Sequence, residues 1–394
     1  MSLSRQRGLR ARILGIASIS LAALALSACG SSDTSATGGE ATAGASASSA
    51  SVSDAKAAIA KLEQPVASWP AATKLSKTTD LSGKKIMVIP LGDTIPVLHG
   101  FGLGAKQALE HLGATVDVCD GKVSPTTVAT CLQQAQAQKD FAVISFFVSY
   151  PMDANAFDAL AKSGTKVIIA GDSPEEGKSY HENIGFFSFG ENLKTLAQHS
   201  AEAAIAEEGD NAHVIWMGQT DSADTVAAAT EGQARMKELC PKCTVVLDRY
   251  STANADQIAS NLSALLVQNP KTNIVVLPVD TIASNALQGI QSAGFASKVK
   301  LISTGSDLSG LQRIKSGQQA HDFAAPVIYD GYAAVNALMQ LAAGDTVTPL
   351  QNVTRDITKN NIDSITINDT EYFTSHWFGS DTFIQDFYTA WGAK

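Results

Sequence analysis

The sequence predicts an α/β protein built from two doubly wound parallel-sheet lobes. From residue 84 onward, short apolar runs rich in β-branched residues alternate with amphipathic stretches of helical length. Strands that alternate with helices form a parallel sheet that is covered on both faces. The series breaks at 182–190 and restarts near 212, which favours two sheets over one continuous sheet. With 394 residues, of which 45% are apolar, the chain is long enough for two cores.

The first 28 residues predict an export signal. Four arginines between positions 5 and 12 precede an apolar stretch at 13–26, which is too short to span a bilayer comfortably. The stretch ends at 26–29 in LSAC, which resembles a bacterial lipobox, where the cysteine is diacylated and becomes the new N-terminus. We therefore expect a lipoprotein signal peptide at 1–28 and a lipid on Cys29. The alternative is a plain secretory signal followed by a chance cysteine.

The segment after Cys29 predicts a spacer. Residues 30–53 are mainly Ser, Ala, Gly and Thr, with no aromatic side chain, so they cannot form a core and are typical of a flexible stalk. A short helix at 54–63 and an extended segment that ends at Gly83 are expected next. The lipidated cysteine, the stalk and this lead-in together occupy 29–83.

The charge balance bears on the partners. Without the four arginines of the signal peptide, 25 basic residues face 38 acidic ones, a net charge of −13. Such a balance argues against nucleic acid as a partner, because the phosphate backbone is bound by cationic surfaces. No other uncharged apolar run approaches membrane-spanning length. We therefore expect a domain tethered by lipid rather than embedded in the membrane.

The remaining four cysteines predict disulfides, since an even number is typical of exported proteins. Pairing of sequence neighbours gives Cys119–Cys131 and Cys240–Cys243. The second pair, CPKC, has the spacing of a thioredoxin-like redox motif. A reactive motif of this kind places its first cysteine at a helix N-terminus, whereas this one lies between a helical stretch and a strand. A structural clip is therefore favoured over a redox site.

The alternation predicts each element in turn. The expected strands are 86–91, 114–118, 141–148, 166–170, 212–217, 244–247, 273–278 and 299–303. The expected helices include 97–112, 125–138, 152–163, 190–208, 222–239, 254–268 and 281–293.

Glycines at 100, 102 and 104 follow the first strand and raise the hypothesis of a phosphate-binding loop. The apolar positions 97, 101, 105, 108 and 112 form one helical stripe, so these glycines lie inside the helix 97–112. The spacing also lacks the third glycine of the dinucleotide fingerprint. We interpret the glycines as allowing close approach of the helix to the sheet. The loop proper is 92–96, at the carboxyl end of the first strand, where open α/β sheets bind ligands.

Polar and aromatic residues follow most of the predicted strands. Because the carboxyl ends of parallel strands lie at one edge, these residues predict a small-molecule site between the lobes. Helix N-caps select Asp, Ser and Thr at the same positions, so capping is the alternative for part of the set. The residues are Asp93, Thr94, Phe147, Ser149, Tyr150, Asp172 and Ser173 in the first half, and Gln219, Thr220, Asp221, Ser222, Tyr250, Ser251, Thr252, Asp280, Thr281, Ser306 and Asp307 in the second.

From residue 84 to about 360, the order of parts resembles the type I periplasmic solute-binding proteins, in the ribose-binding-like branch that supplies ABC importers. The resemblance implies two lobes joined by three chain crossings, near 189, 325 and 352, with a ligand trapped between them by hinge closure. Lobe 1 would comprise 84–188 plus 326–352, and lobe 2 would comprise 189–325 plus 353–394. The segments that carry the resemblance are DTIPVLHGFGLGAKQALEHLGATV, FAVISFF, TKVIIAGD, FGENLKTLAQHSAEAA, EGQARMKELCPKCTVV, VVLPVDTIASNALQGIQSAG and PVIYDGYAAVNALMQLAAGD.

The resemblance also implies a function. The chain would capture a sugar-like or less polar cyclic compound and deliver it to an ABC permease, as a monomer that needs no cofactor. The alternative is a ligand-sensing lipoprotein that signals to a membrane receptor without import. The implied ligand contacts are Asp93, Thr94, Pro96, Phe147 and Asp172 in lobe 1, and the loop 219–224, Thr252, Asp280 and the turn 305–307 in lobe 2.

The sequence departs from the sugar-binding pattern in lobe 2. Ala227 and Ala228 stand where an arginine commonly grips ring hydroxyls, and Ala324 stands where a glutamine is frequent. These departures favour a ligand less polar than ribose, with Phe147, Tyr150 and Trp377 supplying apolar or stacking surface. Phe146 is the internal control, because neighbouring strand residues point to opposite faces.

Two further patterns bear on function. Phe383, Phe387 and Trp391 repeat at helical spacing and predict a helix docked on one lobe, or alternatively an aromatic patch that faces a partner. The seven histidines show no paired metal spacing, and no GxSxG elbow is present. Clustered carboxylates could serve acid–base catalysis, but they also accept hydrogen bonds in binding proteins. We therefore expect no enzyme activity and no metal.

Overall fold

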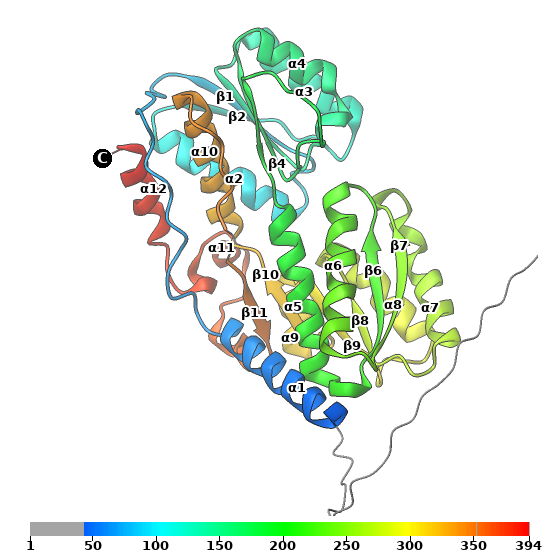
Figure 1. Ribbon diagram of the computed structural model, residues 1–394. Helices are drawn as coiled ribbons and strands as arrows, with labels where there is room; N and C mark the ends of the chain where they lie inside the picture. Colours follow the sequence, from blue (N-terminus) through cyan, green and yellow to red (C-terminus); the bar gives the residue numbers. More distant parts are fainter. Residues whose placement is uncertain (1–42, 352, 394) are drawn as a thin grey trace, which may run out of the picture. The chain divides into compact units, whose positions relative to one another are not determined.

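The computed structural model describes residues 43–351 and 353–393, which form two sheets flanked by helices (Figure 1). The first sheet has the strand order β2-β1-β3-β4-β5, and the second has the order β11-β10-β9-β8-β6-β7. Every pair is parallel except β10 with β11, so the second sheet carries one antiparallel edge strand. This arrangement confirms the two doubly wound lobes. The signal peptide, Cys29 and the first part of the stalk lie outside the described residues.

The strands match the predicted runs closely. The first sheet contains β1 (Lys85–Pro90), β2 (Thr115–Val118), β3 (Ala142–Phe146), β4 (Lys166–Ala170) and β5 (Ile184–Phe187). The second contains β6 (His213–Gln219), β7 (Thr244–Tyr250), β8 (Ile274–Val276), β9 (Lys300–Gly305), β10 (His321–Ala324) and β11 (Arg355–Thr358).

The helices follow the strands in the expected alternation. They are α1 (Ala43–Leu62), α2 (Pro96–His111), α3 (Pro125–Gln138), α4 (Ala154–Lys162), α5 (Gly190–Glu208), α6 (Ala223–Leu239), α7 (Ile258–Gln268), α8 (Ala283–Ser292), α9 (Leu308–Ser316), α10 (Val327–Ala343), α11 (Asp369–Tyr372) and α12 (Phe383–Trp391).

Two sequence predictions need correction. The predicted stalk reaches residue 53, but α1 begins at Ala43 and continues to Leu62. Alanine has the highest helix propensity, and the buried Ala55 and Ile59 pack in one cluster with α5, which favours extending the helix. The prediction also omitted β5, β10 and β11, because each has only four residues and shows no clear periodicity.

Both faces of each sheet are covered. On β1, Ile86 and Val88 belong to the cluster that includes α2 and α10, whereas Met87 and Ile89 belong to the cluster with α3 and α4. The second sheet is covered by α5 and α6 on one face and by α7 and α8 on the other. Apolar residues on both faces explain why these strands appear as continuous apolar runs in the sequence.

The glycines of α2 have a partner that differs from the prediction. A Cβ at Gly100 would lie 2.5 Å from Val327, and one at Gly104 would lie 2.5 Å from the Ile328 oxygen, both on α10. A Cβ at Gly102 would meet Val88 of the sheet at an ordinary 3.8 Å. The expectation of close helix–sheet approach was therefore wrong for Gly100 and Gly104, which allow close helix–helix approach, whereas Gly102 faces the sheet at ordinary contact distance.

Between β1 and β11, three chain crossings join the two lobes, as predicted. The chain passes from β5 in the first sheet to α5 on the second, from β10 to α10 beside α2, and from α10 back to β11 (Figure 1). The terminal segments contact both lobes. α1 packs on α5, whereas the Trp69 ring stacks on Tyr329 of α10 with ring centres 4.9 Å apart.

The C-terminal aromatic residues dock a helix, as predicted. Phe383, Phe387 and Trp391 of α12 are each about 1% exposed and pack on α10. The Trp391 Nε1 donates to the Asn336 Oδ1 at 3.0 Å. Burial of these three rings excludes the alternative of a partner-facing patch made by them. β11 of the same C-terminal segment pairs with the second sheet.

Both predicted disulfides are present, joining Cys119 to Cys131 and Cys240 to Cys243. Cys240 follows the C-terminus of α6, so the CPKC motif lacks the helix N-terminus that would lower a thiol pKa. This position favours the structural clip. Within 43–351 and 353–393, none of the helices is both long and apolar enough to cross a bilayer.

Candidate functional site

Loops from the carboxyl edges of both sheets meet at a place we call the interlobe junction. Ser173 follows β4 in the first lobe, and Asp224 lies in the first turn of α6 in the second. The Ser173 hydroxyl lies 2.9 and 2.8 Å from the two Asp224 carboxylate oxygens. Ser188, at the first chain crossing, lies 2.6 Å from Ser173. The predicted loops of the two lobes are therefore in direct contact.

On the first-lobe side, Asp93 lies in the loop between β1 and α2. Its carboxylate pairs with the His99 Nδ1 at 3.0 Å, and its backbone N–H donates to Asp120 at 2.8 Å. Thr94 and Pro96 are exposed beside it, and Pro96 occupies the first turn of α2, where its missing N–H costs nothing. The predicted loop thus presents a carboxylate that is paired with His99, on a backbone that is bonded to Asp120.

Phe147 adopts a left-handed backbone conformation, with φ of 59°, directly after β3. Its ring is only partly buried and stacks on Phe101 and Phe189, with ring centres 5.9 and 5.5 Å away. Phe146 is fully buried, which matches its use as the internal control. The three stacked rings provide an aromatic wall at the carboxyl edge of the first sheet.

In the loop after β3, Tyr150 is buried and Ser149 is partly exposed. Tyr150 is 4% exposed, and its hydroxyl donates to Asp158 of α4 at 2.8 Å, so its ring belongs to the core. Trp377 is likewise buried, against Tyr372 in the C-terminal segment. The structure brings neither ring to the junction, contrary to the stacking hypothesis. Ser149 remains partly exposed.

Asp172 is the acidic residue at the centre of this edge. Its carboxylate accepts the Tyr150 backbone N–H at 3.1 Å. Burial raises the pKa of Asp172 above its ordinary value, and the nearby Asp224 adds to the rise. A carboxylate that is half buried and beside another carboxylate favours a ligand that donates hydrogen bonds.

In the second lobe, Gln219, Asp221 and Thr252 form one exposed network. The Gln219 Nε2 donates to Asp221 at 2.7 Å, and the Thr252 hydroxyl donates to the same carboxylate at 2.8 Å. Thr220 instead donates its hydroxyl to the Tyr250 carbonyl at 3.0 Å. Gln219 and Asp221 therefore offer polar atoms, whereas Thr220 serves its own loop.

Asp280 lies deeper than the sequence predicts. It is 3% exposed and pairs with the Arg313 guanidinium at 3.1 Å. It also accepts the backbone N–H of Asp307 at 3.0 Å. Burial raises the pKa of Asp280, and burial together with the neighbouring Asp280 raises that of Asp322. The two carboxyl groups can share a proton as part of the lobe interior.

The neighbouring turn is likewise internal. Ser306 is 1% exposed and donates its backbone N–H to Asp322 at 3.0 Å, and Asp307 caps α9 by accepting the Gly310 N–H at 2.6 Å. The structure thus does not bring Asp280 and Ser306 to the surface of the junction. A polar residue after a strand can either contact a ligand or cap the next helix. Asp307 caps a helix, as the capping alternative predicts.

Two hollows lie near the second sheet, at opposite edges. A cavity of about 50 Å³ is at the carboxyl edge, where Gln219 forms part of its lining. A cavity of about 510 Å³ is at the amino edge, lined by residues such as Lys300 and His321. None of the predicted ligand residues lines the larger cavity.

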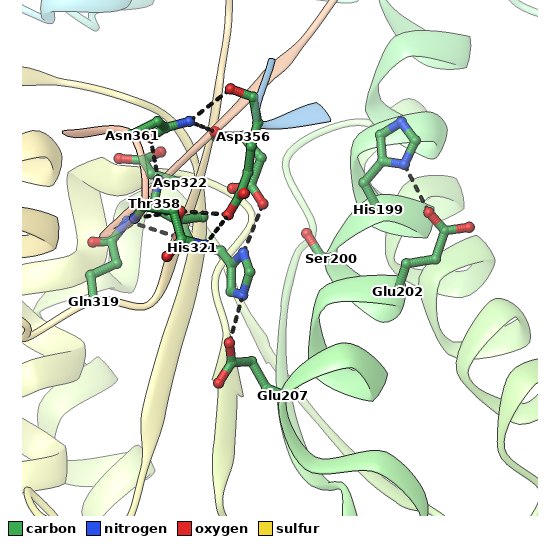
Figure 2. Close-up of polar contacts among 12 residues, drawn as sticks. His199, Ser200, Glu202, Glu207, Gln319, His321, Asp322, Asp356, Thr358 and Asn361 are labelled. Carbon is green, nitrogen blue, oxygen red and sulfur yellow. Dashed lines mark hydrogen bonds and ion pairs between the residues drawn. The ribbon is translucent and has the colours of Figure 1, made fainter. Parts of the chain in front are cut away.

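The polar cluster beside the larger cavity connects three elements (Figure 2). His321 of β10 lies 2.7 Å from Asp356 of β11 and 3.2 Å from Glu207 of α5. Burial by itself lowers the pKa of His321, but the two carboxylates raise it to about 10. The bond with His321 lowers the pKa of Glu207 to about 2. This charged cluster links α5 to the edge of the sheet.

Sequence reasoning included Asp224 only as part of the predicted loop 219–224, because it resembles an ordinary acidic residue of a first helical turn. It missed three other residues at the junction. His99, Phe101 and Phe189 lie within or beside helices, so only their packing on Asp93 and Phe147 identifies them. Within the described residues, no group of three or more His, Cys, Asp or Glu side chains could hold a metal ion.

Known proteins resemble this chain at two levels. Residues 86–346 match the family model described as periplasmic binding protein domain. The D-xylose-binding periplasmic protein of Escherichia coli K12 is 28% identical over 125 residues, which cover 31% of this chain and 37% of that protein. The sequence match therefore spans little more than a third of that relative's length.

Solved structures share the fold. A solute-binding protein of an ABC transporter from Agrobacterium vitis, bound with α-D-tagatopyranose, gives a TM-score of 0.62 at 18% identity and covers 72% of this chain and 97% of its own. The myo-inositol-binding protein of Caulobacter gives 0.61 at 18% identity, with coverages of 74% and 97%. A 5-methylthioribose-binding protein from Thermotoga lettingae gives 0.61 at 14% identity, with coverages of 79% and 98%.

The family model covers most of the chain, and the two-lobed fold with its three crossings accounts for the match. This chain belongs to the periplasmic binding protein family, with the type I fold.

Proposed function

We propose that this chain is an extracytoplasmic solute-binding lipoprotein that captures a sugar-like or less polar cyclic compound at the interlobe junction. The single observation that carries the proposal is the contact between Ser173 of the first lobe and Asp224 of the second, at 2.8 to 2.9 Å. Because this contact joins the carboxyl edges of both sheets, a ligand held there would touch both lobes. Its binding energy would then favour the closed arrangement.

The chemistry of the junction supports a ligand that donates hydrogen bonds. Asp93, Asp172 and Asp221 provide carboxylate oxygens, and hydroxyl groups are suitable donors to them. The stack around Phe147 provides an apolar surface, which suits the carbon face of a ring. The relatives that bind D-xylose, tagatopyranose and myo-inositol support the same ligand class.

The proposed cellular role includes delivery to an ABC permease. The lipobox at 26–29 supports anchoring through Cys29, and the net negative charge supports a function without nucleic acid. We propose a monomer that uses no cofactor and catalyses no reaction, since the relatives are solute-binding proteins.

The test is calorimetric titration of the mature chain with D-xylose, D-tagatose, myo-inositol and 5-methylthioribose. Asp93→Asn and Asp172→Asn should each weaken binding by roughly 10- to 100-fold, because a hydrogen bond to a charged group contributes about 1.5–3 kcal/mol. Asp381→Asn, at an exposed position of the C-terminal segment, is the matched control and should bind like the parent. If no compound binds, or if all three variants bind equally, the proposed site and ligand class are wrong.

A further inference from the structure

The small cavity at the carboxyl edge of the second sheet lies beside the predicted site. Gln219 at the end of β6 belongs both to this cavity and to the polar network with Asp221 and Thr252. The lining comes from α5, α6 and the ends of β6, β8 and β9, which Figure 1 shows on one side of the second lobe. A ligand held by that network would therefore lie next to the cavity.

Most of the lining is carbon. Trp216, Val276 and Leu277 form the wall on the sheet, and Leu193 and Leu196 of α5 face it together with alanines of α5 and α6. Trp216 is 2% exposed, and its ring fits under Gly232 of α6, where a Cβ would lie 2.3 Å from it. The wall is thus held in place by close packing.

The hydroxyl groups of the lining are already bonded to backbone carbonyls. Ser200 donates to Leu196 at 2.9 Å, Thr225 donates to Ser222 at 2.9 Å, and Thr304 donates to Pro278 at 2.6 Å. A hydroxyl has one proton to donate, so none of the three has a donor left for a ligand. Despite three hydroxyls, the cavity has little donor capacity.

Two polar atoms of the lining remain without a partner in the part of the chain that the structure describes. They are the Gln219 Oε1, since its amide nitrogen is bonded to Asp221 and Thr252, and the Trp216 Nε1. This pair is one acceptor and one donor, so it does not by itself distinguish an ether oxygen, which can accept from the Trp216 N–H, from a hydroxyl, which can also donate to the Gln219 Oε1. A charged group would lose water and find few partners there. The carbon walls and the small volume limit the substituent.

The volume limits what can enter. About 50 Å³ is room for a few water-sized groups, since one water needs about 10–15 Å³ on this scale. A second sugar ring is too large, whereas a methyl, methoxy or methylthio group fits. Ala228 contributes to this room with its single methyl group.

From the carbon walls, the engaged hydroxyls and the volume, we infer that this cavity is a subsite for a small apolar substituent on the ligand. The inference rests on the proposed function, because it assigns the ligand as a sugar or cyclitol that carries a methyl, methoxy or methylthio group. Each CH₂ buried there should tighten binding roughly fourfold, since its transfer from water contributes about 0.8 kcal/mol.

The first test concerns the cavity alone. Crystals of the mature chain pressurised with xenon should show xenon between Trp216 and Ala228, because dry apolar cavities bind it. Water hydrogen-bonded at that place and no xenon would overturn the inference. This result does not depend on whether any sugar binds, so it separates the inference from the proposed function.

The second test concerns the ligand. D-xylose, D-ribose and myo-inositol are titrated beside their mono-O-methyl derivatives, and at least one derivative should bind about fourfold or more tightly than its parent. Ala228→Leu, which fills the cavity, should remove this preference, whereas the matched variant Ala234→Leu, at an exposed position of the same helix outside the lining, should retain it. A melting curve verifies that both variants fold. Equal affinities of every parent compound and its derivative would overturn the inference. If no compound binds, the proposed ligand class is wrong, and the xenon experiment alone tests the cavity.

Discussion

At the scale of single residues, two groups of charged side chains in the second lobe pair with one another. His321 lies between the buried Asp356 and the partly exposed Glu207 (Figure 2). Arg313 lies beside Asp280, and both are buried. Removing a charge from water costs several kcal/mol unless a partner compensates for it. These pairs therefore determine how the stability of the lobe responds to pH and to substitution.

His321 should make the stability depend on alkaline pH. Its folded pKa of about 10 lies above the ordinary value of 6.5, because Asp356 and Glu207 outweigh burial. Its contribution to the free energy of unfolding is fully present below pH 6.5. Between pH 6.5 and 10 only the unfolded state loses the proton, so this contribution is lost as pH rises. Glu207, with a pKa lowered to about 2, contributes above pH 4.5 and is lost in acid. Urea unfolding from pH 6 to 10 should show this decline.

His321→Asn should flatten that profile and lower the free energy of unfolding by roughly 3–5 kcal/mol, because Asp356 is left buried without its cation. His376→Asn is the control, since His376 pairs with Glu371 at 2.8 Å but its side chain is 59% exposed. The assignment is wrong if both variants follow the profile of the parent chain.

At the scale of elements, close helix–helix packing joins α2 to α10. These helices are far apart in the sequence and lie side by side on the first sheet (Figure 1). Gly100 and Gly104 on α2 let the α10 backbone approach, and Gly331 does the same from α10. Because α10 begins and ends at chain crossings, its close attachment to α2 fixes two of the three connections to the first lobe.

Gly104→Ala should destabilise the protein by roughly 1–3 kcal/mol, because the new methyl would lie 2.5 Å from the Ile328 oxygen and force α10 away. Gly102→Ala is the matched control in the same helix, where the new methyl has 3.8 Å of space. There the higher helix propensity of alanine should leave stability unchanged or raise it by up to about 1 kcal/mol. Thermal unfolding distinguishes the two, and equal effects would argue against the packing role.

At the scale of the whole molecule, contacts outside the sheets join the two lobes. The N-terminal segment packs on α5 through α1, and its Trp69 then packs on Tyr329 and Phe383. At the interlobe junction, Ser173 and Asp224 connect the lobes by hydrogen bonds. Separation of the lobes at the junction has to break the bonds between Ser173 and Asp224. The contacts of the N-terminal segment lie on α5 and α10, the helices that adjoin the crossings.

Ser173→Ala should shift the ligand-free protein towards separated lobes by roughly tenfold in population, because a hydrogen bond to a carboxylate contributes about 1.5–3 kcal/mol. Distances between spin labels on α4 and α7 measure the shift. Ser316→Ala, whose hydroxyl bonds within the second lobe, is the control. Identical distance distributions for the parent and both variants would show that the contact does not hold the lobes together.

The sequence by itself determined the fold class, the order of most strands and helices, both disulfides and the docking of α12. These features depend on the periodicity of apolar residues and on the spacing of cysteines and aromatic residues along the chain, both of which can be read from the sequence. It also predicted that the loops after the strands of one sheet lie at one edge, because the carboxyl ends of parallel strands must share an edge.

The tertiary structure decided which residues of those loops are available. Tyr150 and Asp280 follow strands just as Phe147 and Asp172 do, yet the first two point into the lobes and are bonded there. It also gave the α2 glycines a helix as their partner, and placed Asp224 opposite Ser173. The physical reason is that side-chain direction and partner choice depend on contacts between residues far apart in the chain, which no local pattern specifies.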